Sequence, residues 1–441
     1  MDILNYFLTN YALKYSFEKG KVLFGDAEKG CVSIEKEDNG FFNRKEQVST
    51  DGIVWKSWKN KKIPFLFSKD ANKEIVTETN GYVSINYDVV SASSYLLSGW
   101  HEHISNNKNS LGRINYQNSL MEQLGIVEVP VVNYYFDILH TALNQLNDSY
   151  SVEKSKSSVA LSHDIDNCMT AWLEGSFSEL KNKRIHNIPK LLFKRLFKKD
   201  EWFNFEEISA LEATQNARST FFFLPQKGKV NGLKNADYDV TSKTFQNQIE
   251  LLIAKGHEIG LHGSFGTHID FEKFILDKER LGTSVYGNRF HFLMFDVNQT
   301  TSLLEKAGIK YDASIGFAEH MGFRSGTCYP FFLYDFENDR ISNVLELSTH
   351  IMDTTLQHNK YMNIPTDQAF DKVTPIIDEV IKFGGVLSLL WHNTHFSRFK
   401  YGGWKEVYME ILNYCKQHHA KLTTCEDIYQ SVVSQINDEE N

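Results

Sequence analysis

The sequence predicts an α/β protein in which a smaller α+β domain, residues 1–155, precedes a (β/α) barrel domain, residues 156–441. After residue 158, short apolar segments alternate with helical patterns, which is typical of a parallel sheet or barrel. Before that point, short alternating segments are separated by polar residues, and the stretch 148–158 is rich in Ser and Lys, like a linker. The chain of 441 residues is long enough for a barrel of about 250 residues and a second domain.

In the N-terminal part we expect three strands and two helices, with strands at 21–24, 31–34 and 82–87 and helices at 91–100 and 131–146. The first ten residues have no cationic start, no continuous apolar stretch and no small-residue cleavage site. We therefore expect an amphipathic helix there and not a signal peptide.

In the barrel part we expect seven strands, at residues 159–166, 219–225, 258–263, 288–295, 311–316, 345–353 and 386–392. Helical patterns fill the intervals. The one before Gly256 ends at that glycine, which is a common helix stop. The pattern that ends at Gly384 contains Pro375, which should kink or restart the helix.

The composition argues against several classes of protein. Lys and Arg total 47 and Asp and Glu total 56, so the net charge is −9. Nucleic-acid binding needs a cationic surface, so we expect no nucleic-acid partner. No apolar run approaches the ~18 residues of a membrane span. The five cysteines are scattered without paired spacing, which favours a reducing compartment and no cysteine zinc site. With neither a signal peptide nor a span visible, we expect a cytoplasmic protein.

Charged and imidazole side chains gather at the ends of the predicted strands. Side chains alternate between the two faces of a strand, and chemistry in a parallel barrel collects at the C-terminal strand ends. With the apolar face of each strand turned to the helices, four strands bring two aspartates, three histidines and one arginine to the same mouth: Asp164, Asp166, His262, Arg289, His291 and His392.

These residue types favour metal-assisted hydrolysis. Carboxylate and imidazole together are a common ligand set for Zn²⁺, Fe²⁺ and similar ions. A second carboxylate can act as general base and a separate histidine as general acid. Each residue alone also fits a structural role, such as a helix N-cap for an aspartate, a buried hydrogen-bonded histidine, or Arg289 as partner of Asp164. Their coincidence at successive strand ends favours the catalytic interpretation.

Five motifs carry a family resemblance. They are Leu-Ser-His-Asp-Ile-Asp at 161–166, Ser-Thr-Phe-Phe-Phe at 219–223, Gly-His-Glu-Ile-Gly-Leu-His at 256–262, Arg-Phe-His at 289–291 and Leu-Leu-Trp-His at 389–392. In this order they resemble the motifs of the polysaccharide deacetylase family, carbohydrate esterase family four. The family motifs are Thr-Phe-Asp-Asp-Gly, Ala-Thr-Phe-Phe, Gly-His-Glu-Ile-Gly-x-His, Arg-x-Pro and Leu-x-His. The resemblance covers about residues 158–430 and implies an irregular (β/α)7 barrel.

The resemblance implies roles for the residues at the mouth. It implies that Asp164, Arg289 and His392 are catalytic and that Asp166 and His262 bind a divalent metal, most simply Zn²⁺. We assign Asp166 to the metal because it lies beyond the strand end, and Asp164 as the base beside Arg289. Near His392, Asn393 and His395 are expected to bind substrate, with a turn or a helix cap as the alternative.

The third metal ligand departs from the family pattern. The family places a second histidine four residues after the first, and here that position is Gly266. We expect His291 to replace it, because a histidine on a strand has a fixed direction. His268 is the alternative, and it would have to be returned by a Gly-flanked loop at a cost in ordering entropy.

The N-terminal part, at 92–101, 112–115 and 130–133, resembles an uncharacterised domain that precedes such deacetylases in surface-polysaccharide gene clusters. The leading hypothesis is therefore a metal-dependent hydrolase that removes acetyl groups from N-acetylated sugars of a surface polysaccharide or its precursor. One alternative is a non-catalytic glycan-binding or assembly protein on the same barrel. Another is a hydrolase of a small non-peptide amide. The sequence predicts neither the sugar nor the oligomeric state.

Overall fold

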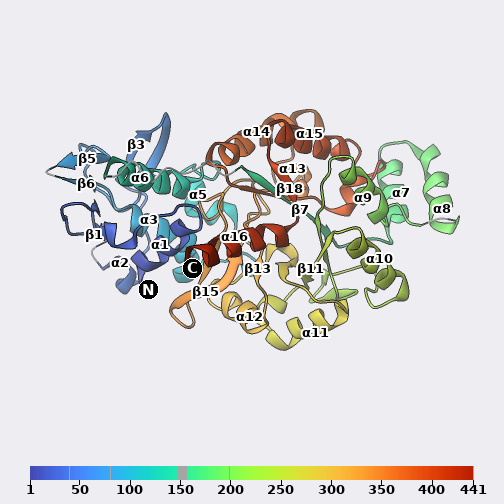
Figure 1. Ribbon diagram of the computed structural model, residues 1–441. Helices are drawn as coiled ribbons and strands as arrows, with labels where there is room; N and C mark the ends of the chain where they lie inside the picture. The colour runs from blue at the N-terminus through green and yellow to red at the C-terminus, as the bar shows by residue number, and fades with distance from the viewer. Residues whose placement is uncertain (39, 80, 147–155, 198, 441) are drawn as a thin grey trace.

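The computed structural model describes residues 1–38, 40–79, 81–146, 156–197 and 199–440. Figure 1 shows an elongated molecule, with the N-terminal elements at one end, the barrel sheet in the middle and the helices α7 (Ala171–Lys181) and α8 (Ile188–Phe197) at the other end. The predicted domain boundary at residue 155 falls beside residues outside the described part.

The barrel sheet consists mainly of parallel strands. In spatial order they are β15 (Arg340–Glu346), β13 (Tyr311–Asp312), β12 (Gly287–Phe290), β11 (Glu258–Gly263), β8 (Thr220–Phe223), β7 (Ser158–Ile165), β17 (Val386–Leu390) and β16 (Ile351–Met352). The antiparallel strand β14 (Phe331–Asp335) borders β15, and β18 (Lys421–Thr423) pairs with the first half of β7. The sheet is curled, which confirms the predicted α/β barrel class.

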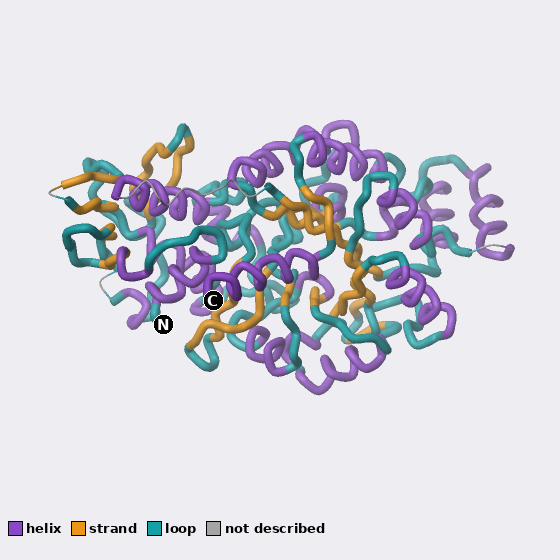
Figure 2. The backbone as a smooth tube through the Cα atoms, in the orientation of Figure 1, coloured by secondary structure: helices purple, strands orange, loops and turns teal. Residues whose placement is uncertain are grey.

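Helices cover the outside of this sheet (Figure 2). They are α9 (Phe205–Ala213), α10 (Lys243–Ala254), α11 (Phe271–Leu281), α12 (Thr300–Lys306), α13 (Asp353–Gln357), α14 (Thr366–Phe383) and α15 (Trp404–Gln417). The last helix, α16 (Cys425–Glu440), packs on the barrel interior instead. A small hairpin, β9 (Lys229–Val230) and β10 (Leu233–Lys234), lies between β8 and α10. No helix in the described ranges has the length and apolarity needed to cross a membrane.

The N-terminal part is built on a four-stranded sheet in the order β1 (Val22–Phe24), β2 (Val32–Ile34), β6 (Tyr82–Ile85) and β5 (Val76–Thr79). Its helices include α1 (Ile3–Ala12), α2 (Phe41–Arg44), α3 (Val89–Leu97), α4 (Trp100–Ile104), α5 (Leu120–Gln123) and α6 (Val131–Leu146). The predicted strands and helices of this part are present. The hairpin of β3 (Val54–Trp58) and β4 (Lys61–Phe65) adds to them.

The barrel interior confirms the predicted alternation of side chains. Ala160 of β7 packs in one cluster with Phe222 of β8 and Tyr311 of β13, whereas Val159 and Leu161 belong to the separate core under the helices. A side chain at Gly260 would collide with the ring of Phe222, which explains the glycine in the middle of β11. Cys425, Ile428 and Val432 of α16 join the interior cluster and close it from the C-terminal helix.

Two predicted strands were wrong. The strand predicted at 288–295 ends at Phe290, because Phe292 and Leu293 adopt left-handed backbone angles with φ of 61° and 51°. The strand predicted at 345–353 is divided between the end of β15 and β16. Of the two alternatives for Pro375, a kink or a restart, the restart does not occur, because helix α14 passes through this residue as one element.

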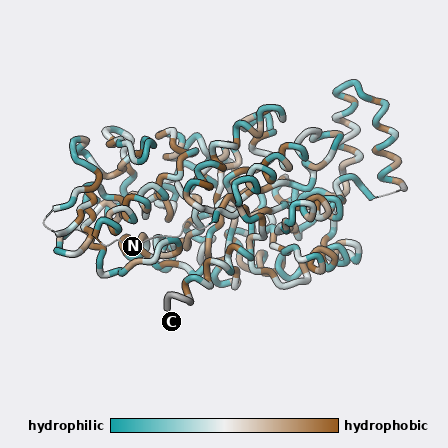
Figure 3. Tube along the Cα trace, turned by 45° about the horizontal axis from the view of Figure 1, so that its top comes forward, coloured by the Kyte–Doolittle hydropathy of each residue, from teal (hydrophilic) through white to brown (hydrophobic). Residues whose placement is uncertain are grey.

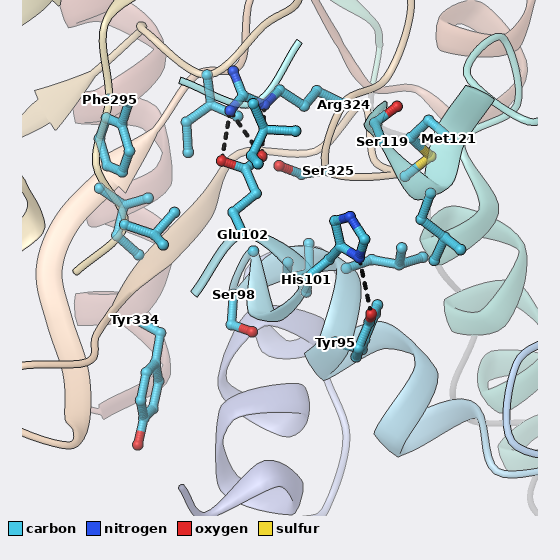
Figure 4. Close-up of a pocket in the computed structure, with 18 of the residues that line it drawn as sticks. Tyr95, Ser98, His101, Glu102, Ser119, Met121, Phe295, Arg324, Ser325 and Tyr334 are labelled. Carbon is cyan, nitrogen blue, oxygen red and sulfur yellow. Dashed lines mark hydrogen bonds and ion pairs between the residues drawn. The ribbon is translucent and has the colours of Figure 1, made fainter. Parts of the chain in front are cut away.

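The N-terminal part contacts the barrel through ion pairs and hydrogen bonds. The carboxylate of Glu102 accepts three bonds from the guanidinium of Arg324, at 2.6 Å, 2.7 Å and 2.9 Å, beside a cavity of about 50 Å³ (Figure 4). Arg113 pairs with Glu319 at 3.2 Å and donates to the backbone carbonyl of Phe292. The ammonium of Lys14 donates to the carbonyl of Gly384 at 2.7 Å.

A buried ion pair joins the first barrel strand to the helix layer. Both ring nitrogens of His163 face acceptors, the carbonyl of Trp391 at 2.7 Å and the carboxylate of Glu212 at 2.8 Å. Glu212 also accepts from Ser219 at 2.6 Å and from Tyr408. Burial alone would raise the pKa of Glu212, but the charge of His163 and these bonds hold it below its usual value.

We predict that Glu212→Ala lowers the free energy of unfolding by about 3–5 kcal/mol, because it breaks a buried pair and leaves His163, Ser219 and Tyr408 without their shared acceptor. A carboxylate with a lowered folded-state pKa stabilises the fold above its unfolded pKa and loses that effect as the pH falls through the folded value. Glu212→Gln has no carboxylate to protonate at this position. Its free energy of unfolding should therefore fall less than that of the wild type when the pH drops below about 5. Denaturant unfolding at several pH values measures both effects. Glu206→Gln, on the exposed side of the same helix, is the control and should change neither.

Candidate metal centre and active site

Three donor atoms meet at the C-terminal ends of β7, β11 and β12. Nε2 of His262 lies 3.2 Å from Oδ1 of Asp166 and 3.2 Å from Nδ1 of His291, and the remaining separation, His291 to Asp166, is 3.6 Å. Ligands bound tetrahedrally at about 2.0–2.1 Å from a zinc ion lie roughly 3.4 Å from one another. The three spacings therefore match the edges of such a coordination shell, and these atoms form one candidate ligand group.

The hydrogen bonds on the far side of each ring orient these donors. Nδ1 of His262 donates to the carbonyl of Arg289 at 2.7 Å, and Nε2 of His291 donates to the carbonyl of Lys234 at 3.0 Å. The lone pairs of the two other nitrogens are left to face each other and Asp166. Oδ1 of Asp166 is buried and has no hydrogen-bond partner among the described residues. Converging lone pairs repel unless a cation lies between them, so the donor set fits a divalent metal.

The electrostatics of the three groups agree with this. Burial alone would lower the pKa of His262, but the charges of Asp164 and Asp166 raise it. Burial would raise the pKa of Asp166, yet the neighbouring histidines hold it well below its usual range. Burial lowers the pKa of His291 to about 4, so this ring is neutral and has a lone pair available at neutral pH. The site favours an added positive charge.

Beside this group, Asp164 is held by Arg289. The guanidinium donates through Nη1 to Oδ1 of Asp164 at 2.9 Å and to Oγ of Ser162 at 2.9 Å, and through Nε to the carbonyl of Ala313 at 2.9 Å. It also lies over the ring of Phe222, 4.6 Å from the centroid. Oδ2 of Asp164 is 3.6 Å from Nε2 of His262. One carboxylate oxygen is thus paired with the arginine, while the other faces the ligand group.

His392 approaches from the opposite side and is paired with a residue that the sequence reasoning missed. Its Nδ1 donates to Asp353 at 2.6 Å, and its backbone N–H donates to the other oxygen of that carboxylate at 2.6 Å. The second ring nitrogen, Nε2, is 3.7 Å from Asp166. Burial would lower the pKa of His392, but the charge of Asp353 and the bond to it raise the pKa to about 10. The ring is therefore protonated at neutral pH.

Asp353 follows directly after β16, at a strand end like the other site residues. The sixth predicted strand ended at this residue, but alternation through one strand of 345–353 places Asp353 on the apolar face with Leu345 and Ile351. Only its position at the strand end was a signal for it.

The remaining predicted site residues lie around this centre. His268 is in a short turn after β11, outside the ligand group, and burial lowers its pKa to about 4. His395 lies 3.0 Å from the second oxygen of Asp353 and stacks on Tyr401 at 3.9 Å. Asn393 is fully buried, and its amide donates to the carbonyls of Asn167 and Trp202 at 2.9 Å and 2.7 Å.

His291 is close to His262 and Asp166, but not for the reason we expected. It stands in a turn that begins after β12 ends at Phe290, and not on the strand itself. The bond from its Nε2 to Lys234, together with the left-handed residues Phe292 and Leu293, sets the direction of the ring.

Comparison with known proteins gives one family and several structures. Residues 4–148 match the model of a family of unknown function, DUF7033. The search of curated proteins finds no match. The similar structures include a protein of Mycobacterium smegmatis assigned to the polysaccharide deacetylases, 16% identical, with a TM-score of 0.42, covering 65% of this chain and 93% of the other.

Two further structures are similar. Puue allantoinase is 14% identical, with a TM-score of 0.40, covering 64% of this chain and 91% of the other. The polysaccharide deacetylase Bc1974 from Bacillus cereus is 14% identical, with a TM-score of 0.30, covering 61% of this chain and 92% of the other. Polysaccharide deacetylases, the family that the sequence motifs resemble, are thus among the matched structures. The function proposed below rests on the site geometry.

We predict that His291→Ala weakens divalent-metal affinity by roughly 10-fold or more, because it removes one of three protein donors. His268→Ala should leave the affinity unchanged, since this histidine lies outside the ligand group. Calorimetric titration of metal-free protein with Zn²⁺ measures both values. If His268→Ala abolished binding and His291→Ala retained it, the ligand assignment would be reversed.

Proposed function

We propose that this protein is a metal-dependent hydrolase that removes acetyl groups from N-acetylated sugars of a surface polysaccharide or its precursor. The observation that carries the proposal is the arrangement around Asp166. The three candidate metal donors have a carboxylate and an imidazolium as neighbours. The carboxylate is Asp164, which is bonded to Arg289, and the imidazolium is His392, which is bonded to Asp353. A base, a metal position and an acid in this order are what hydrolysis of an amide needs.

Asp166, His262 and His291 would hold the metal. Two imidazoles and one carboxylate form a set typical of catalytic zinc, which leaves a fourth position open. A bound divalent ion acidifies water and polarises the acetyl carbonyl. Zn²⁺ is therefore the expected ion.

Asp164 would act as the general base. Its Oδ1 accepts a hydrogen bond from Arg289 at 2.9 Å, which holds the carboxylate in place beside the ligand group. Its other oxygen faces the ligand group and can accept a proton from water there. Arg289 is itself fully buried and would position the base without touching the substrate.

His392 would act as the general acid. Asp353 fixes the ring by its bond to Nδ1, so the Nε2 proton points toward Asp166 and the reacting centre. The side chains of Asp166 and His392 keep 17% and 14% of their surface exposed, the most among the site residues, so the substrate can reach this side.

A small apolar cluster of Leu293, Ala318, Met352 and Leu390 supports an acetyl substrate. Leu293, Met352 and Leu390 each lie one or two residues from His291, Asp353 and His392 respectively. An acetyl methyl group is small and apolar, and its transfer from water to such a cluster is favourable.

Asn393 and His395 take a different role from the substrate binding that we expected. The amide of Asn393 is buried and bonded to backbone carbonyls, and His395 shares Asp353 with His392. We therefore propose that both residues position the loop that carries His392.

We predict that the protein loaded with Zn²⁺ releases acetate from N-acetylated sugars and oligosaccharides. Asp164→Asn should keep metal affinity but lower kcat by ~10²-fold or more, as loss of a general base does. Asp166→Asn should instead weaken metal binding. Acetate release from a panel of substrates, with metal content measured in parallel, tests the three statements. A metal-loaded protein that binds glycans without releasing acetate would support the non-catalytic alternative.

We also predict that Asp353→Asn lowers kcat by roughly 10- to 100-fold without changing metal affinity, because His392 loses the partner that orients and charges it. Thr354→Val is the matched control, since its hydroxyl makes only longer contacts with this pair, 3.2 Å to Oδ1 of Asp353 and 3.5 Å to Nδ1 of His392. Steady-state kinetics with calorimetric metal titration separates the two effects. Loss of metal binding in Asp353→Asn would place this carboxylate in the ligand shell instead.

A further inference from the structure

The helical hairpin α7–α8 stands away from the body of the protein. Figures 1 and 3 both show the two helices projecting from the end opposite the N-terminal part. The helices pack on each other where Gly175 meets Leu191. A polar groove of about 820 Å³ lies between the hairpin and the segment 396–406. The hairpin is therefore only partly covered by the rest of the chain.

The hairpin exposes large apolar side chains. Of the twelve large hydrophobic residues that are exposed among the described residues, seven belong to it, including Leu173, Phe177, Leu180, Ile185, Phe193 and Leu196. Phe177 and Leu196 are 70% and 73% exposed. On α7 these positions follow a spacing of four and three residues, so they share one face of the helix. A patch of this kind marks an interaction surface.

The same segment is strongly cationic. Residues 181–199 contain eight Lys or Arg and no Asp or Glu, in a chain whose net charge is −9. Lys181, Lys183, Lys190 and Arg195 are exposed. Arg184 and Lys194 pair with Glu179 and Glu201 at 2.8 Å and 3.3 Å. Exposed cations and exposed bulky apolar side chains therefore occur together on one projecting element.

We propose that the α7–α8 hairpin docks this protein on an anionic lipid bilayer. Helices of this composition lie in the membrane interface, with apolar groups in the acyl boundary and cations at the headgroups. Each Lys or Arg near an anionic surface adds to the attraction. Two hairpins fit against each other poorly, because the segments 181–199, with eight cations and no acid each, would repel each other.

Docking in this way would bring the candidate active site to the membrane surface. The hairpin begins at Ala171, five residues after Asp166, so both follow closely after the end of β7. A substrate attached to a lipid would then meet the site without leaving the bilayer surface. The docking itself does not depend on the proposed hydrolysis.

Vesicle co-sedimentation of the full chain tests the proposal. Wild-type protein should bind vesicles of phosphatidylcholine mixed with phosphatidylglycerol and bind much less to phosphatidylcholine alone, and added salt should weaken the binding. The double variant Phe177→Ser, Leu196→Ser should lose about tenfold or more in affinity. Lys190→Gln with Arg195→Gln should lose a similar factor at low salt.

The matched control is Leu251→Ser with Leu276→Ser, which removes two apolar residues that are 51% and 49% exposed on α10 and α11. It should bind like the wild type, and circular dichroism should show all variants folded. Equal binding to neutral and anionic vesicles, no vesicle binding at low salt, or an equal loss in the control would overturn the proposal. The proposal would also be overturned if the wild type bound no vesicles but formed a dimer, and the hairpin variants were monomeric.

Discussion

The site depends on one buried cation, the guanidinium of Arg289. An ionised group without exposed surface is tolerated in a barrel only when it is paired and hydrogen-bonded. Its side chain holds Asp164 and the carbonyl of Ala313, and it lies over the ring of Phe222, which fills the barrel below. Its own backbone carbonyl orients His262. A single residue of β12 therefore joins the interior packing, the candidate base and one candidate metal ligand.

The N-terminal part supports the same site from outside the barrel. Arg113 donates to the carbonyl of Phe292, one of the two left-handed residues that turn the chain after His291. Lys108 pairs with Asp296 at 2.8 Å, a few residues farther along the same loop. A loop with these backbone angles needs external contacts to stay in one conformation. The N-terminal part thus contributes to the geometry of the third candidate ligand without offering a donor of its own.

Much of the fold and several site positions were predictable from local pattern. Period-two alternation on apolar strands places Asp164, His262 and Arg289 inside the barrel, because one apolar face must meet the helices. The direction of His291 was not predictable, since it depends on a turn held by contacts with Lys234 and with the N-terminal part. Asp353 was missed because the segment 345–353 reads as one strand and is two. Asn393 was assigned to substrate because sequence shows proximity to His392 but not burial.

Helix α10 and the hairpin α7–α8 illustrate what a hydrophobic pattern leaves undetermined. In α10 and in α7–α8, apolar residues recur at helical spacing, yet Phe245 and Ile249 of α10 are buried, while Phe177 and Leu196 of the hairpin are exposed. The spacing of apolar residues predicts that a helix has an apolar face, but it does not predict what covers that face. The distinguishing feature is charge, because residues 181–199, which include α8, contain eight cations and no acid, whereas α11 and α15 mix both signs. A folded chain retains such a surface when water is not its final environment.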